Sequence, residues 1–92
     1  ELFAAAVTEV ERHQLIPYRR HHCGHGIGLE AYEPPLIGPT VDQALEPGMV
    51  LCFETPYYEL GWGGMMVEDT VVITDNGCEL LSVSDRSLRV VG

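Results

Sequence analysis

The segment PGMVLCFE, residues 47–54, is a turn followed by a short apolar run. Pro47-Gly48 marks the turn, and every residue from Met49 to Phe53 is apolar. A run of this length after a turn signal is typical of a strand that is covered on both faces. We therefore expect a buried strand here, ended by the acidic residue Glu54.

Two further strands are expected after this segment. Residues 61–64 contain three glycines and predict a loop, whereas residues 65–74 are rich in Met, Val, Ile and Thr and predict a strand. The sequence Asp75-Asn76-Gly77 is a strong hairpin signal, because Asn-Gly tolerates positive φ. The chain should then return as a strand over residues 78–83.

The sequence before residue 47 predicts a helix and then extended chain. Residues 2–15 have an amphipathic pattern on a background of Ala and Glu, and Pro17 ends it. Residues 18–32 are expected to be extended or irregular, and they lead into a turn at Glu33-Pro34-Pro35. One amino-terminal helix followed by about four mainly antiparallel strands makes an α+β fold.

Composition limits both the size and the partners of the chain. Its 92 residues form one small core at most, and we interpret residues 1–92 as a single partial domain, because the sequence starts at Glu1 already in a helical pattern. Five basic against fourteen acidic residues give a net charge of -9, which disfavours nucleic acid and anionic membranes as partners.

The cysteines and the apolar runs indicate a cytoplasmic protein. The three cysteines, Cys23, Cys52 and Cys78, form no disulfide framework and are interpreted as small buried hydrophobes in a reducing compartment. No apolar run approaches the roughly 18 residues that a membrane span requires. Export and membrane anchoring are therefore not expected.

The acidic residues Glu54 and Glu68 stand out because apolar residues surround both. A buried carboxylate costs several kcal/mol unless a cation or a metal compensates it. With His25 they make a mixed nitrogen and oxygen set that suits Mn, Co, Fe or Zn. The alternatives are a hydrogen-bonded structural histidine, exposure of the acids at a sheet edge, or pairing with arginine.

The segment around His25, HHCGHGIGLEAYEPP (residues 21–35), alternates glycine with other residues. Its G-x-G-x-G pattern lacks the spacing of a nucleotide-binding loop, so close approach of another backbone, a ligand or a large side chain explains the glycines better. His21 and His22 are weaker ligand candidates than His25, and His13 is expected on the helix surface.

Three ordered stretches, GHGIGLEAYEPP (24–35), LEPGMVLCFETPYY (45–58) and GWGGMMVEDTVVITDNGCELLS (61–82), resemble the carboxy-terminal half of the pita-bread metallopeptidase family. That family includes methionine aminopeptidase, Xaa-Pro aminopeptidase, prolidase and the metal-free creatinase. The resemblance implies a mainly antiparallel curved sheet after the amino-terminal helix. It also implies a hydrolase that acts on amino-terminal peptide bonds of the Xaa-Pro type.

By this resemblance, His25, Glu54 and Glu68 are metal ligands in a site for two divalent ions. Glu68 would bridge the two ions, and His25 and Glu54 would both ligate one of the two. Glu54 would also handle the proton of the attacking water. Two ions about 3.5 to 4 Å apart can lower the pKa of that water and polarise the scissile carbonyl.

Departures from the family pattern leave alternatives open. Tyr32 stands where the peptidases usually have a second histidine, and Met66 stands where prolidase-like members often have arginine. We predict that Tyr32 lies at the mouth of the site and contacts substrate. The rival functions are a creatinase-like or other non-peptide amidohydrolase, and a binding module without catalysis.

The resemblance also predicts partners. The family's two aspartate ligands come from the amino-terminal half of the fold, so residues 1–92 should hold three of five ligands and be inactive alone. That half should dock on an apolar face of the sheet. A peptide substrate and a possible homodimer are the other expected partners.

Overall fold

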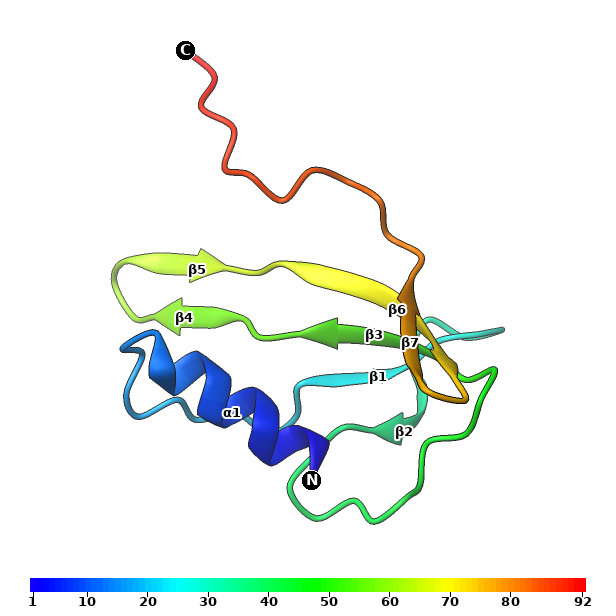
Figure 1. The fold of residues 1–92 in the computed structure, drawn as a ribbon. Helices are drawn as coiled ribbons and strands as arrows, with labels where there is room; N and C mark the ends of the chain where they lie inside the picture. The colour runs from blue at the N-terminus through cyan, green and yellow to red at the C-terminus, as the bar shows by residue number, and fades with distance from the viewer.

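The computed structural model describes residues 1–92 and contains one helix and seven strands (Figure 1). The helix α1 spans Leu2–Arg12 and precedes all of the strands. The strands form a five-stranded antiparallel sheet and a separate two-stranded hairpin. This architecture confirms the predicted α+β class, with an amino-terminal helix followed by a mainly antiparallel sheet.

Helix α1 ends earlier than the residue pattern predicted. Its last helical residue is Arg12, and Gln14 adopts a left-handed φ of 71°, which the helix cannot continue through. The three residues from Gln14 to Ile16 therefore leave the helix before Pro17 is reached. His13 caps the helix and is exposed, as expected.

The larger sheet has the strand order β2-β1-β3-β6-β7. Its members are β1 (Gly24–Gly26), β2 (Glu33–Leu36), β3 (Val50–Glu54), β6 (Glu68–Thr74) and β7 (Gly77–Leu80). Strand β3 lies in the middle, and its residues Leu51 and Cys52 are only 1% and 3% exposed. The prediction of a buried strand after the turn is therefore confirmed.

Several strand boundaries differ from the prediction. The expected loop at residues 61–64 is wrong in part, because Gly63–Met65 forms β5 and pairs with β4 (Tyr57–Glu59). The expected turn at Glu33–Pro35 belongs to β2, which lies at the edge of the sheet, where proline's missing N–H is tolerated. Strand β7 ends at Leu80, short of the predicted Val83.

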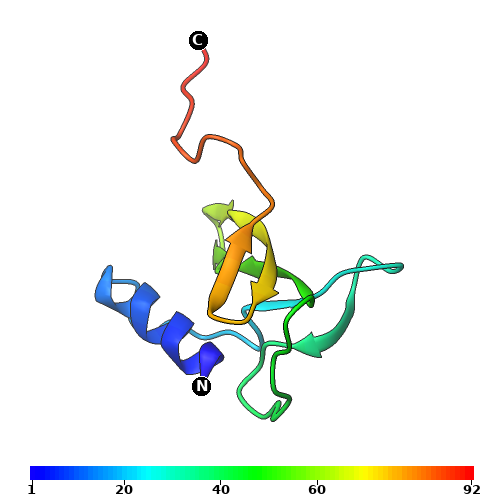
Figure 2. The same ribbon diagram turned by 45° about the vertical axis from the view of Figure 1, so that its right-hand side comes forward.

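Helix α1 lies on one side of the sheet (Figure 2). Its residue Ala6 joins Tyr18 and Cys23 in a small buried cluster, and Phe53 of β3 packs against this cluster. The residues after β7 form neither helix nor strand and run away from the sheet in both views (Figures 1 and 2). No helix has the length and apolar character that crossing a membrane requires.

The cysteines are reduced and differ in burial. Cys23 and Cys52 are buried, as predicted, but Cys78 is exposed, so its interpretation as a buried residue was wrong. The reason is its position in β7, an outer strand of the sheet whose four residues are all exposed.

Candidate functional site

The strand register places the three predicted metal ligands on one face of the larger sheet. His25 of β1 lies opposite Cys52 of β3, and Glu54 of β3 lies opposite Glu68 of β6. Residues directly opposite each other in antiparallel strands point to the same face, as do residues two apart along one strand. His25, Glu54 and Glu68 therefore share a face, and Cys52 lies on that face as well.

Close backbone packing around the glycines brings β1 to its place beside β3. Gly24 has a φ of 151°, and a Cβ added there would collide with the carbonyl oxygen of Cys52. On the other side of β1, a Cβ on Gly26 would collide with the carbonyl oxygen of Pro34 in β2. The interpretation of these two glycines as sites of close backbone approach is confirmed.

The imidazole of His25 is buried and held in one orientation. Its Nδ1 lies 2.9 Å from the carbonyl oxygen of Gly26, and a carbonyl can only accept, so Nδ1 carries the proton. The same ring stacks on Tyr32, with the two ring centroids 4.0 Å apart. The lone pair of Nε2 is thereby left available for a metal ion, which is the tautomer that a histidine ligand needs.

One group of side chains is close enough to hold a metal ion: His25, Cys52 and Glu68 each offer a ligand atom, and these atoms lie within 4.8 Å of one another. The sequence did not point to Cys52 as a ligand, because it stands inside a continuous apolar run. Its spacing of two residues from Glu54 was the available signal, since that spacing places both side chains on one face of a strand.

The two acidic residues differ in burial. The side chain of Glu54 is 11% exposed, which agrees with its expected burial. Glu68 is exposed, so the prediction of a buried carboxylate there was wrong. Glu68 opens β6 directly after the break at Met66 and Val67, whose side chains are also exposed.

A second group of side chains surrounds Glu54. Its Oε1 lies 3.6 Å from Nδ1 of His22, and Nε2 of His22 lies 3.1 Å from the hydroxyl of Tyr32. The Nδ1 atom is buried and has no hydrogen-bond partner. His22 thus links Glu54 to Tyr32, although its sequence context gave it less weight than His25.

Tyr32 is 54% exposed, and its ring covers the imidazole of His25. The role of Tyr32 at the mouth of the site and in contact with substrate stays a prediction. Met66, the other departure from the family pattern, is 51% exposed and lies between β5 and β6.

Burial raises the pKa of the Cys52 thiol above its usual value, and the neighbouring Glu68 side chain raises it further. The thiol is therefore neutral near pH 7 when no cation is beside it. The donor set of imidazole nitrogen, carboxylate oxygen and thiol sulfur fits a divalent transition metal.

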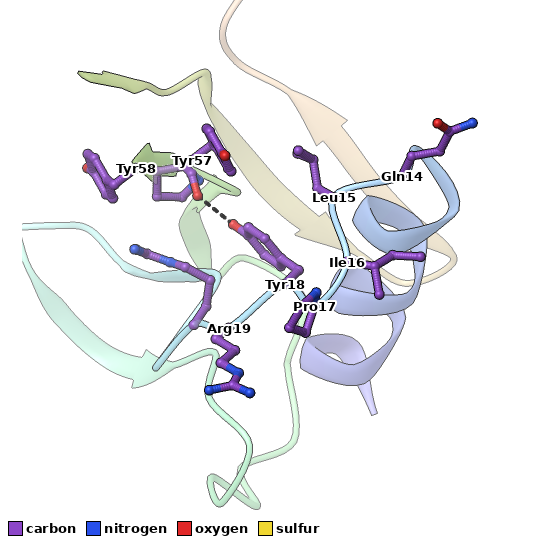
Figure 3. Close-up of a pocket in the computed structure, with 10 residues that line it drawn as sticks. Gln14, Leu15, Ile16, Pro17, Tyr18, Arg19, Tyr57 and Tyr58 are labelled. Atoms are coloured by element: carbon purple, nitrogen blue, oxygen red, sulfur yellow. Dashed lines mark hydrogen bonds between the residues drawn. The ribbon is translucent and has the colours of Figure 1, made fainter. Parts of the chain in front are cut away.

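Figure 3 shows a cavity that other residues line. It has a volume of about 380 Å³ and is lined by residues 14–20 together with Pro56, Tyr57 and Tyr58. The Tyr18 hydroxyl donates a hydrogen bond of 2.8 Å to the carbonyl oxygen of Pro56, drawn as the dashed line, and Arg20 lies 5.6 Å from the centroid of the Tyr58 ring. None of the predicted metal ligands lines this cavity.

Known proteins resemble the chain in both sequence and structure. The Xaa-Pro dipeptidase of Pyrococcus furiosus is 38% identical over 88 residues, which are 96% of this chain and 25% of that protein. The solved prolidase from Pyrococcus furiosus superimposes with a TM-score of 0.84 at 37% identity, over 94% of this chain and 26% of that one.

The X-Pro aminopeptidase from Thermotoga maritima gives a TM-score of 0.88 at 34% identity, over 98% of this chain and 26% of that one. The chain therefore spans about a quarter of the length of these relatives. The model of metallopeptidase family M24 matches residues 1–75. The chain belongs to metallopeptidase family M24 and corresponds to the carboxy-terminal part of its pita-bread fold.

Proposed function

We propose that the full-length protein is a peptidase that uses two divalent metal ions to hydrolyse amino-terminal peptide bonds of the Xaa-Pro type. The observation that carries the proposal is the shared face of His25, Glu54 and Glu68 on three neighbouring strands. The fixed tautomer of His25 supports it, because Nε2 is free to bind a metal. Xaa-Pro specificity is supported by the names of the relatives.

The side chains around Glu54 suit proton handling. When bound, the ions lower the pKa of water and polarise the scissile carbonyl. Oε1 of Glu54 accepts a proton from the attacking water, and Nδ1 of His22, 3.6 Å away, shares it. The Tyr32 hydroxyl, held by Nε2 of His22, is placed to contact the substrate.

Residues 1–92 supply three of the five ligands in this proposal, and two aspartates come from the amino-terminal half of the fold. The same half covers the apolar face of the sheet, where Leu80 remains 49% exposed. Without the aspartates the second ion loses its ligands, so the isolated chain is inactive. The metal is Mn, Co, Fe or Zn.

A second candidate is a creatinase-like or other non-peptide amidohydrolase on the same fold. Tyr32 favours it, because a phenol, which is a weak acid near pH 7, takes the place of the second histidine of the peptidases. The two candidates differ in substrate, and a panel of amides separates them.

The test compares His25→Ala with His13→Ala in the full-length protein. His13 is the exposed residue that caps α1 and contacts Glu9 rather than the proposed ligands, so its substitution controls for the loss of an imidazole. We expect His25→Ala to lose bound metal and the hydrolysis of Xaa-Pro dipeptides, and His13→Ala to keep both. Full metal content in His25→Ala would contradict the proposal, and hydrolysis of creatine-like amides alone would favour the second candidate.

A further inference from the structure

We propose that Cys52 is a metal ligand, so that His25, Cys52 and Glu68 bind zinc through nitrogen, sulfur and oxygen. The inference rests on the metal site of the proposed function and adds a thiolate to its ligands. The consequence is a preference for zinc or cadmium over manganese, because thiolate is a soft ligand.

The position of Cys52 carries the argument. It lies directly opposite His25 in the antiparallel pair of β1 and β3, so both side chains point to the same face. Its Sγ is within 4.8 Å of a ligand atom of His25 and of one of Glu68. Cys52 is 3% exposed, so the side chains packed around it in the central strand β3 fix the direction of its own side chain.

The polar neighbours of the sulfur atom are Glu68, which is itself a proposed ligand, and Thr70. Its hydrogen-bond contact with a hydroxyl is the one to Oγ1 of Thr70, at 3.8 Å, which is long and weak even for sulfur. The other cysteines lack this environment: Cys23 packs with Ala6 and Tyr18, and Cys78 is exposed on β7.

Coordination needs only a small adjustment. Zinc takes sulfur at about 2.3 Å and nitrogen at about 2.0 to 2.1 Å, so ligand atoms separated by up to 4.8 Å must move somewhat closer together. The exposed side chain of Glu68 is free to make this movement. The thiol proton leaves to the solvent when the Zn–S bond forms.

The first experiment replaces the metal of the full-length protein with Co²⁺ and records its absorption spectrum. A thiolate ligand gives a sulfur-to-cobalt charge-transfer band in the near ultraviolet, in addition to the visible bands of bound cobalt. We expect the charge-transfer band in the wild type and in Cys78→Ser, and its loss in Cys52→Ser with the visible bands retained. Cys78→Ser removes a thiol outside the group and controls for thiol number.

Two further measurements complete the test, and the first of them needs no variant, so it remains decisive if Cys52→Ser folds poorly. X-ray absorption of the zinc-loaded wild type should show a sulfur neighbour at about 2.3 Å. Competition of zinc against manganese should show zinc affinity falling in Cys52→Ser by more than the roughly 10- to 100-fold that loss of an outer-shell partner costs.

The outcomes separate this inference from the function on which it rests. Bound cobalt with visible bands but no charge-transfer band, and zinc with only nitrogen and oxygen neighbours, would overturn the role of Cys52 and leave the peptidase proposal standing. A wild-type protein that binds manganese or iron but neither cobalt nor zinc would overturn the role of Cys52 alone, and one that binds none of the four metals would overturn both.

Discussion

The two faces of β3 use alternate residues of the same five-residue strand in different ways. Leu51 and Phe53 point to the face where α1 lies, and Phe53 packs against the cluster that α1 helps to form. Cys52 and Glu54 point to the opposite face, beside His25 and Glu68. One face of this strand thus supplies packing, and the other carries the proposed metal ligands.

The apolar face is only partly covered. An open cavity of about 410 Å³ lies over it, and its lining is mostly apolar: Leu2, Leu45, Leu51, Phe53, Asp69, Val71, Ile73, Gly77, Cys78 and Leu80. Only 12 of the 92 residues are buried, so each well-buried side chain contributes a large share of the packing. Substitutions on the apolar face should therefore change the free energy of unfolding, and substitutions on the opposite face should change metal binding or kinetics.

The largest expected effect is on the apolar face. Leu51→Ala should lower the free energy of unfolding by about 2 to 5 kcal/mol, because Leu51 is 1% exposed and its truncation leaves a cavity. Urea unfolding of the full-length protein measures this change. Leu60→Ala, at a fully exposed leucine, is the control and should change it little. A small effect of Leu51→Ala would mean that the apolar face contributes little stability.

An intermediate effect on stability is expected at Tyr18, whose hydroxyl donates a 2.8 Å hydrogen bond to the carbonyl oxygen of Pro56. Tyr18→Phe should lower the free energy of unfolding by about 1 to 3 kcal/mol at pH 7, because the Pro56 carbonyl is left unsatisfied. Tyr58→Phe is the control, since the Tyr58 side chain is 65% exposed. Equal stability of the two variants would contradict this prediction.

The same substitution should weaken the pH dependence of stability at alkaline pH. Burial raises the pKa of Tyr18 above its ordinary value of 10.0, the nearby Cys23 raises it further, and Arg20 partly opposes this. The folded state therefore holds the phenol proton more tightly than the unfolded chain does. Its contribution to stability is complete below pH 10 and is lost as the pH rises through the folded-state pKa. Tyr18→Phe should lose less stability than the wild type over that alkaline interval.

The smallest effect on stability is expected on the opposite face, at Tyr32. Tyr32→Phe removes the hydroxyl bonded to His22 and keeps the ring that stacks on His25. We expect kcat/KM of the full-length protein to fall about 5-fold or more, the equivalent of roughly 1 kcal/mol for a lost hydrogen bond, with metal content unchanged. Tyr57→Phe, on the β4–β5 hairpin, should leave both unchanged. Unaltered kinetics in Tyr32→Phe would assign Tyr32 to packing.

Much of the fold could be predicted because its signals are local. The periodicity of α1, the turn before β3 and the Asp75-Asn76-Gly77 hairpin each act within a few residues. The β4–β5 pairing was missed, because Gly63 and Gly64 favour loops and become a strand only through a partner strand. The edge strand β2 was also missed, because its two adjacent prolines predict a turn.

The candidate site was less accessible to sequence reasoning. His25, Glu54 and Glu68 are chemically conspicuous, and their role as ligands stays a prediction. Cys52 was hidden, because sulfur counts as apolar in a hydrophobic run. His22 was undervalued, because its contact with Glu54 joins residues 32 positions apart and depends on the pairing of β1 with β3.

The two edge strands of the larger sheet, β2 and β7, differ in their capacity to pair with a strand of another molecule. Strand β2 presents Pro34 and Pro35, which have no N–H to donate to an incoming strand. Strand β7 contains no proline, and all four of its residues are exposed. Strand addition from another molecule is therefore blocked at β2 and open at β7, so self-templated aggregation of this sheet would proceed from β7, and a proline placed there would stop it.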